Sequence, residues 1–223
     1  MKIQVILLDD EALITDLLSN FLQQDPTIEV KGTYNFGTTF LEAMQEATTL
    51  PDLFILDYRI GDMDGLELLK RLRTLGIQTP VILLSSHYTD SLISFIVKTG
   101  FAAFLPKNIK SNILIEVVHE VYNKGFYLLP VQFEHLREQM LIKNQPLTTD
   151  LKIALTEREI EVLHLIAQQK TGKEIAERLF ISLKTVEGHK NSLFLKTGAK
   201  NVVGLIVYAV QHKLLSLDEI SMY

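Results

Sequence analysis

The first 125 residues alternate between short apolar runs and amphipathic stretches, and this alternation limits the possible folds more than any other feature. The apolar runs are short and rich in Leu and β-branched residues: Ile3–Leu8, Glu29–Gly32, Leu53–Leu56, Val81–Leu84 and Ala103–Leu105. Such runs are typical of strands buried on both faces of a parallel sheet. The stretches between them predict helices at Ala12–Gln24, Gly37–Glu46, Gly65–Leu75, Asp90–Thr99 and Ser111–Asn123. The pattern therefore predicts a doubly wound, flavodoxin-like α/β domain with a parallel five-stranded sheet.

The pattern changes after residue 125. Residues 126–154 contain two prolines, a helical pattern at Gln132–Lys143 and then a polar run, and we interpret them as a partly helical linker. No strand-like run follows, and four helices are predicted, at Thr156–Gln168, Gly172–Leu179, Leu183–Thr197 and Val202–His212. We therefore expect a small all-α, four-helix domain at 155–215 and a tail at 216–223.

Charge is distributed unevenly between the two parts. The whole chain has 27 acidic and 22 basic side chains, a formal net charge of −5, which by itself argues against a nucleic-acid partner. From Leu151 onward, however, ten Lys and Arg outnumber eight Asp and Glu, and seven of these cations lie between Lys170 and Lys200. Charge asymmetry of this kind indicates different partners for the two parts.

Composition excludes several classes of protein. The chain has no cysteine, which excludes disulfides, thiolate catalysis and cysteine-based zinc sites. Its first apolar run is short and is followed by acids at residues 9–11, which is typical of neither a signal peptide nor a membrane span. No apolar run approaches the roughly 18 residues of a membrane span. We therefore expect a soluble, cytoplasmic protein with no membrane partner.

Acidic residues follow two of the predicted strands. Asp9 and Asp10 end the first apolar run, and Asp57 ends the third. The carboxyl ends of parallel strands meet at one edge of a sheet, so these three carboxylates would repel one another and raise each other's pKa. A hard divalent cation removes this repulsion, and oxygen ligands are what Mg²⁺ prefers. The sequence therefore predicts a magnesium site at this edge.

Two further residues follow the next strands and complete a site for phosphoryl transfer. Lys107 follows the fifth run and would supply a fixed positive charge, and Ser85 follows the fourth and would donate a hydroxyl hydrogen bond. Carboxylates, a metal, a lysine and a hydroxyl suit a transferring phosphoryl group. Asp57 would be the nucleophile and would form an acyl phosphate.

Residues 1–125 resemble the receiver domain of two-component response regulators. The resemblance rests on the Asp9/Asp10 pair, the DxxxxxxDG segment from Asp57 to Gly65, Ser85, and Phe104 three residues before Lys107. It implies that Asp57 accepts a phosphoryl group from the phosphohistidine of a sensor kinase. It further implies that Mg²⁺ is bound by Asp10, Asp57 and the main-chain carbonyl of Arg59, with Asp9 acting through water. Ser85 would then move toward the phosphoryl group, and Phe104 would turn inward behind it.

Two residues of this segment depart from the commonest family pattern. Ser85 stands where threonine is usual, which keeps the hydroxyl and loses a methyl group. Gly61 stands where proline is frequent, which loosens the loop after Asp57.

Helix starts are clearly marked in the second part. Thr156 with Glu159, and Thr171 with Glu174, have the spacing of capping boxes, and Ser182 is a predicted N-cap. Three closely spaced starts with a small apolar face predict a helix-turn-helix, whose second helix enters the major groove of DNA.

Residues 155–215 resemble the DNA-binding domain of LuxR-type regulators, on the stretches LTEREIEVLHLIA, KEIAERLFIS, KTVEGHK and LIVYAV. The resemblance implies that Leu183–Thr197 is the recognition helix. The candidate contacts to phosphates or bases are Lys173, Lys184, Thr185, Val186, Glu187, Gly188, His189, Lys190, Asn191, Lys196 and Lys200. Val186 is equally well interpreted as a core residue, and Lys196 and Lys200 as solvated charges. Gln169 stands where the family usually has glycine.

Together, the two resemblances are typical of response regulators of the NarL/FixJ class. We expect phosphorylation of Asp57 to favour a dimer that binds two half-sites of promoter DNA, with RNA polymerase as a further candidate partner. Catalysis would be limited to the chain's own phosphoryl transfer and dephosphorylation. The helix at Ser111–Asn123 is a candidate dimer surface, although Ile113, Val117 and Val118 are better interpreted as core.

Three alternatives remain open. An orphan regulator would be controlled by a protein partner or a small ligand instead of phosphorylation. A phosphatase of the haloacid-dehalogenase type would need a second aspartate two residues after Asp57, where this chain has Arg59. An interaction adaptor would not bind DNA at all.

Overall fold

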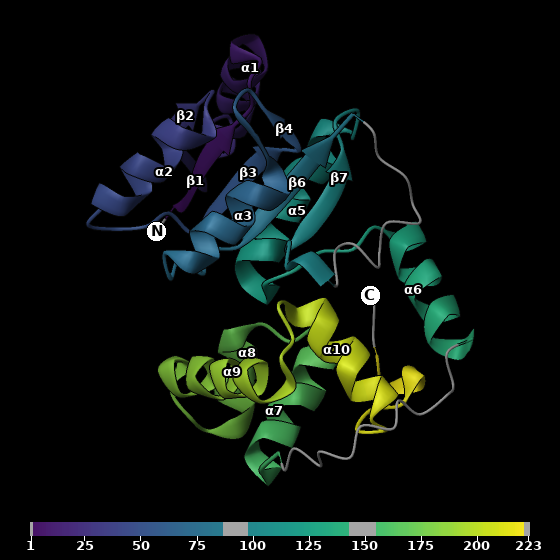
Figure 1. Cartoon of the computed structure of the whole chain (residues 1–223). Coiled ribbons are helices and arrows are strands. Elements are labelled where there is room, and N and C mark those ends of the chain that lie inside the picture. Colours follow the sequence, from purple (N-terminus) through teal and green to yellow (C-terminus); the bar gives the residue numbers. More distant parts are fainter. Residues whose placement is uncertain (1, 87–97, 143–154, 221–223) are drawn as a thin grey trace. The chain divides into compact units, whose positions relative to one another are not determined.

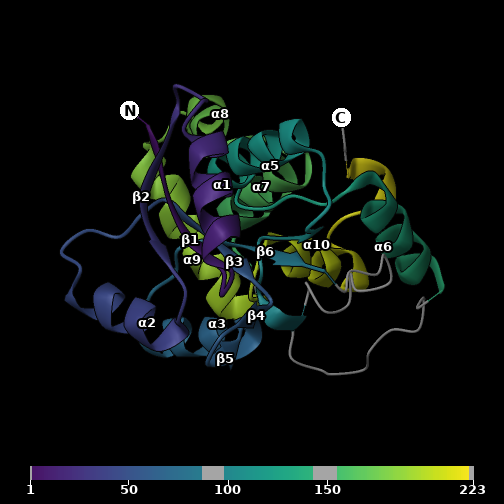
Figure 2. The same ribbon diagram turned by 90° about the horizontal axis from the view of Figure 1, so that it is seen from above.

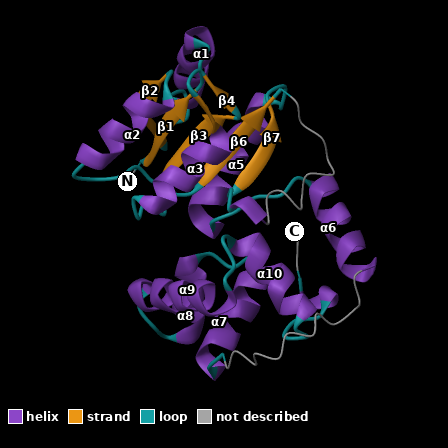
Figure 3. Ribbon diagram, viewed as in Figure 1, coloured by secondary structure: helices purple, strands orange, loops and turns teal. Residues whose placement is uncertain are grey.

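The computed structural model describes residues 2–86, 98–142 and 155–220. They divide into two compact units, one built around a parallel sheet and one built of helices, and each is described by itself (Figure 1). Within the described part of the chain, the strands all belong to the first unit (Figure 3).

The first unit contains a parallel five-stranded sheet, as predicted. Its strands run in the order β2-β1-β3-β6-β7, and they are β1 (Ile3–Leu8), β2 (Ile28–Tyr34), β3 (Leu53–Asp57), β6 (Val81–Ser85) and β7 (Ala103–Pro106). Every residue of β3 and β6 is buried, as expected for central strands covered on both faces. Their carboxyl ends therefore lie side by side at one edge of the sheet.

Helices cover both faces of the sheet. Figure 2 shows α1 (Ala12–Leu22) and α5 (Ser111–Lys124) on one face and α2 (Gly37–Glu46) and α3 (Gly65–Thr74) on the other. The predicted helix at Asp90–Thr99 lies almost wholly outside the described residues. Val117 and Val118 of α5 are fully buried, so they serve the core of this unit.

One short element was not predicted. Strands β4 (Arg59–Ile60) and β5 (Met63–Asp64) form an antiparallel hairpin directly after Asp57. Two-residue strands are too short to produce a period-two pattern in the sequence. The hairpin nevertheless gives a defined shape to the loop that Gly61 was expected to loosen.

The helices of the second unit agree closely with those predicted from the sequence. After α6 (Pro130–Ile142), this unit contains α7 (Glu157–Ala167), α8 (Gly172–Leu179), α9 (Leu183–Thr197) and α10 (Val202–Gln211), and a short 3₁₀ helix follows at Leu217–Glu219. Both predicted capping boxes are present, and Ser182 caps α9 by accepting a hydrogen bond from the N–H of Thr185. Among the described helices, none is long and apolar enough to cross a membrane alone; only α9 and α10 together, bent by 59°, reach that length.

The turns after α7 and α8 place bulky residues in left-handed backbone. Gln169, which replaces the glycine usual in the family, has φ +57°, and Phe180 at the C-cap of α8 has φ +53°. A left-handed conformation costs roughly 1–2 kcal/mol for a residue other than glycine. The side chain of Phe180 is 95% exposed, so burial does not compensate for this cost.

We expect Phe180→Gly to raise the free energy of unfolding of the helical unit by about 1 kcal/mol, because glycine adopts this conformation without a steric penalty. Urea unfolding followed by circular dichroism measures the change. Phe180→Ala is the matched control, since it removes the exposed ring but keeps the steric penalty, and it should have little effect. Equal effects of the two substitutions would contradict backbone strain as the cause.

Candidate functional site

Three carboxylates meet at the carboxyl edge of the sheet. Asp9 and Asp10 directly follow β1, and Asp57 is the last residue of β3. One oxygen from each carboxylate lies within 4.8 Å of the other two, with Asp9 and Asp57 buried and Asp10 exposed. The strand register produces this cluster, because β1 and β3 are adjacent and parallel. The structure thus brings the three predicted acidic residues together.

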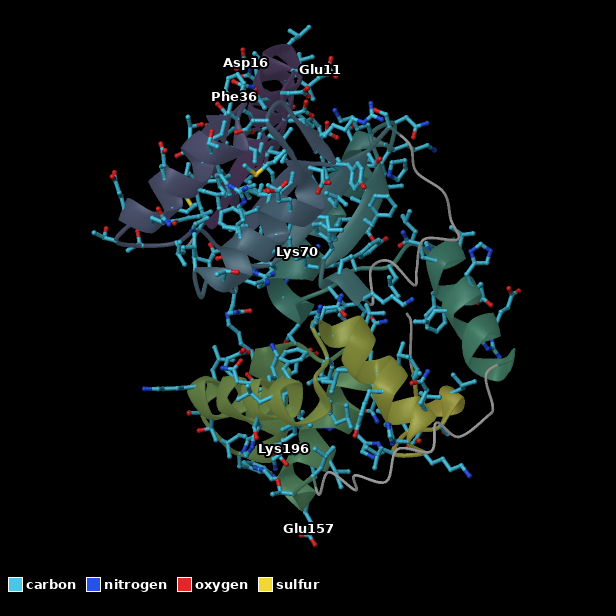
Figure 4. All side chains as sticks on the ribbon, in the orientation of Figure 1. Glu11, Asp16, Phe36, Lys70, Glu157 and Lys196 are labelled. Atoms are coloured by element: carbon cyan, nitrogen blue, oxygen red, sulfur yellow. The ribbon has the colours of Figure 1, made fainter. Side chains whose placement is uncertain are left out.

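Lys107 joins two of these carboxylates. Its Nζ lies 2.8 Å from Oδ2 of Asp9 and 3.1 Å from Oδ2 of Asp57, and Oε1 of Glu11 is 3.8 Å away. Burial opposes the charge on Lys107, but the hydrogen bonds to Asp9 and Asp57 outweigh it and raise the pKa of the lysine. Burial also raises the pKa of Asp57, and Lys107 opposes that effect. Figure 4 shows Glu11 and Phe36 at this end of the first unit.

The acidic cluster has the donor set that a hard cation requires. Oδ2 of Asp9 is buried and lies 2.8 Å from Nζ of Lys107. Oδ1 of Asp57 accepts a 2.7 Å hydrogen bond from the N–H of Tyr58. Arg59 begins β4 two residues after Asp57, on the loop that borders the cluster. Three carboxylates near one lysine therefore leave negative charge that a divalent cation would neutralise.

Ser85 and Phe104 occupy the neighbouring strands. Ser85 ends β6 and is buried, and its carbonyl accepts a 2.9 Å hydrogen bond from the N–H of Lys107. Phe104 lies in β7 opposite Leu83 and is 2% exposed, so it is already turned inward in this structure. Asp57 and Ser85 thus end the adjacent strands β3 and β6, Phe104 lies in β7, and Lys107 directly follows β7.

The hairpin after Asp57 is anchored to the start of α2. Both oxygens of the Asp62 carboxylate accept hydrogen bonds, from the N–H of Gly37 at 2.7 Å and from the N–H of Thr38 at 3.0 Å. A Cβ added at Gly37 would lie 2.6 Å from Sδ of Met63, so glycine allows the hairpin to approach this closely. Asp62 therefore caps α2 although it lies outside that helix. Its hydrogen bonds also restrain the loop after Asp57, in which Gly61 stands where proline is frequent.

Sequence reasoning missed three residues of this site. Glu11 approaches Lys107, Nδ2 of Asn35 donates to the carbonyl of Asp9 at 2.7 Å, and Asp62 caps α2. Asp62 lies 25 residues from the helix it caps, whereas capping signals in a sequence extend over about three residues. Glu11 adjoined the Asp9/Asp10 pair and Asp62 lay within the Asp57–Gly65 segment, whereas Asn35 lay in neither motif.

Most predicted DNA contacts lie on the surface of the helical unit. The exposed candidates are Lys173, Lys184, Thr185, Glu187, Gly188, Asn191 and Lys200. His189 and Lys190 are partly exposed, and Nζ of Lys190 lies 3.0 Å from Oε1 of Glu187. Val186 is fully buried, so of the two roles left open for it the structure supports the core role.

Lys196 pairs with a carboxylate inside the helical unit. Its Nζ lies 2.7 Å from Oε2 of Glu159, and Oγ of Ser192 donates to Oε1 of Glu159 at 2.6 Å. Burial opposes the charge of Glu159, but hydrogen bonds from Lys196, Ser192 and the N–H of Thr156 outweigh it and lower the pKa of Glu159 to about 2. Figure 4 labels Lys196 on this unit. The capping role of Glu159 was predicted, whereas its pairing with Lys196 was not.

Comparison with known families gives two matches that together span most of the chain. The family described as "Response regulator receiver domain" matches residues 5–119, and the family described as "Bacterial regulatory proteins, luxR family" matches residues 154–209. The chain therefore belongs to the response regulators, in the NarL/FixJ class that combines a receiver with a LuxR-type DNA-binding domain. This combination makes it a regulator of transcription and not a classical enzyme.

Similar proteins match nearly the full length of the chain. The chain is 30% identical to the transcriptional regulatory protein MctR of Rhizobium johnstonii, with 96% of each chain covered. It is 28% identical to the response regulator protein VraR of Staphylococcus aureus, over 96% of this chain and all of VraR. A solved structure of a complex between the response regulator RcsB and DNA shares the fold, with a TM-score of 0.54 at 20% identity and coverage of 95% and 99%.

The low pKa of Glu159 gives the helical unit a pH-dependent stability. A carboxylate with a depressed pKa contributes stability above its ordinary pKa of 4.5 and loses it as the pH falls toward 2. We expect wild type to be more stable than Glu159→Gln at pH 6, and this difference to shrink steadily between pH 5 and pH 3. Urea unfolding at a series of pH values measures the difference in unfolding free energy.

Glu157→Gln is the matched control for this pH series, because Glu157 is exposed in the same turn of α7 (Figure 4). It should produce a smaller difference at pH 6. A difference between wild type and Glu159→Gln that stayed constant from pH 6 to pH 3 would mean that the charge of Glu159 does not stabilise the unit.

Proposed function

We propose that this response regulator is switched by phosphorylation of Asp57, which promotes dimerisation and sequence-specific binding to promoter DNA. The observation that carries the proposal is the position of Lys107, which lies within ion-pair distance of both Asp9 and Asp57 at the carboxyl edge of the sheet. The site lies in a chain that also contains a LuxR-type DNA-binding domain. Its arrangement of charges suits a phosphoryl group more than a structural ion pair.

The transfer reaction uses few groups. The Asp57 carboxylate would attack phosphorus, the bond from the kinase histidine to phosphorus would break, and an acyl phosphate would form. Lys107 would pair with the phosphoryl oxygens, and the hydroxyl of Ser85 would donate to one of them. Asp9, Asp10, Asp57 and the carbonyl of Arg59 would hold Mg²⁺, which neutralises charge on the transferring group when it is bound. The same pocket would later hydrolyse the acyl phosphate.

The switch is a shift between two populated states. Contact of Ser85 with the phosphoryl group, with Phe104 turned inward behind it, would favour a state that dimerises. The dimer would place two copies of α9 on half-sites about one helical turn of DNA apart. A structure titled as two RcsB dimers bound to two parallel DNAs supports this assembly by analogy, at 22% identity. RNA polymerase is a further candidate partner. Binding to promoter DNA would require the protein to be in the cytoplasm.

The domain limits proposed are 1–125 for the receiver and 155–215 for the DNA-binding domain. They are supported by the family matches, because the first match (5–119) lies within 1–125 and the second (154–209) begins one residue before 155. The DNA contacts proposed are the exposed or partly exposed residues Lys173, Lys184, Thr185, Glu187, Gly188, His189, Lys190, Asn191 and Lys200. Glu187 pairs with Lys190 and offsets its positive charge, so the helical unit of a monomer presents only a modest positive charge to DNA phosphates. This modest charge is why we expect weak binding before dimerisation.

Incubation with acetyl phosphate and Mg²⁺ tests the first step. Intact mass spectrometry should show one added phosphoryl group on the wild type and none on Asp57→Ala, and size-exclusion chromatography should show a dimer only for phosphorylated wild type. Asp16→Ala is the control, because Asp16 is an exposed aspartate of the same unit (Figure 4). Equal modification of Asp57→Ala would place the phosphoryl group elsewhere. No modification of any variant would favour an orphan regulator controlled by a partner or ligand.

A further inference from the structure

We propose that Lys196 is a positioning residue: it holds the recognition helix α9 against α7 through Glu159 and does not contact DNA. The inference rests on the proposed function, because it assigns a role to a residue within the DNA-binding machinery. Lys196 was predicted from the sequence as a candidate DNA contact, and the proposal gives it a different role.

Both carboxylate oxygens of Glu159 accept hydrogen bonds inside the domain. Oε1 accepts from Oγ of Ser192 at 2.6 Å, and Oε2 accepts from Nζ of Lys196 at 2.7 Å and from the N–H of Thr156 at 2.7 Å. Ser192 and Lys196 are four residues apart, so they occupy one face of α9. One carboxylate therefore caps α7 and binds the C-terminal half of α9 at two points.

Burial makes the ion pair between Lys196 and Glu159 costly to break. The side chain of Glu159 is 4% exposed and that of Lys196 is 32% exposed. If Lys196 turned outward to a DNA phosphate, Glu159 would be left as a buried charge without its cation, and such a state is far more costly than an exposed phosphate contact is favourable. Lys196 therefore stays with Glu159 when the domain meets DNA.

The same network controls how α9 presents its base-facing residues. The N-terminal part of α9 is fixed by the Ser182 cap and by the buried Val186, and the C-terminal part by the buried Leu193 and by Glu159. Without the bonds to Glu159, only the apolar contact of Leu193 holds the C-terminal part, so the helix can tilt. The exposed Lys184, Glu187 and Asn191 then lose their alignment with base edges. Loss of the network should therefore reduce discrimination between DNA sequences, whereas phosphate contacts tolerate the tilt.

Salt dependence separates a positioning residue from a phosphate contact. The full-length chain, treated with acetyl phosphate and Mg²⁺, is titrated with a fluorescein-labelled duplex of mixed sequence at several salt concentrations. Each phosphate contact contributes about 0.9 to the slope of log affinity against log salt. Lys173→Met, the matched control at an exposed candidate phosphate contact, should lower the slope by about 2, because the dimer loses two such contacts. Lys196→Met should leave the slope unchanged.

Specificity supplies the second measurement. A duplex selected by the wild type from a randomised pool is compared with the mixed-sequence duplex, and the ratio of the two affinities is recorded. Lys196→Met should lower this ratio roughly tenfold, the size of one lost base contact. Lys196→Arg keeps the cation and should restore most of the ratio. A purely structural role, which changes only the folded fraction, would reduce both affinities equally and leave the ratio unchanged.

Glu159→Gln keeps the inference testable if Lys196→Met fails to fold. Glutamine still accepts the capping hydrogen bond of α7, but the charge that holds Lys196 is lost. The specificity ratio should fall even though Lys196 is retained. An unchanged ratio in Glu159→Gln, or a slope lowered by about 2 in Lys196→Met, would overturn the positioning role. If the wild type itself shows no salt-dependent affinity for either duplex, the proposed function is wrong, and this inference fails with it.

Discussion

The receiver depends on the contact that Lys107 makes with two carboxylates of different strands. Nζ of Lys107 lies 2.8 Å from Asp9 and 3.1 Å from Asp57, and all three groups are largely withdrawn from water. One cation cannot neutralise three carboxylates, so the cluster retains negative charge that favours a metal ion. With a metal bound, the pocket would offer two positive groups to a phosphoryl anion. Under the proposed function, stabilisation of the fold and reactivity toward a phosphoryl group would therefore have the same electrostatic origin.

The DNA-binding domain also contains a buried carboxylate paired with a lysine, but the pKa of this carboxylate is shifted in the opposite direction. Glu159 has its donors within the domain and a pKa lowered to about 2, so its charge is permanent at neutral pH. Asp57 is the opposite case, because burial raises its pKa and its hydrogen bonds are fewer. A fully satisfied carboxylate holds a structure in place, whereas an incompletely satisfied one remains available for chemistry.

The sequence predicted those parts of the molecule whose signals are local. The five strands, the helices at Gly37–Glu46, Gly172–Leu179 and Leu183–Thr197, and both capping boxes follow from periodicity and from residues three apart. The acidic cluster was predictable because one topological rule brings the ends of parallel strands together. Pairings such as Asp62 with α2 and Lys196 with Glu159, 37 residues away, depend on tertiary packing that no local pattern encodes. The burial of Val186 was left open for the same reason.

The central claim is that the charge state of the Asp57 pocket controls DNA binding. The most direct measurement is the affinity of one protein preparation for promoter DNA, by gel shift, before and after treatment with acetyl phosphate and Mg²⁺, beside Asp57→Ala treated in the same way. If phosphorylation of Asp57 is the switch, phosphorylated wild type binds promoter DNA tightly, whereas untreated wild type and Asp57→Ala bind it weakly. Binding by Asp57→Ala as tight as that of phosphorylated wild type would contradict it.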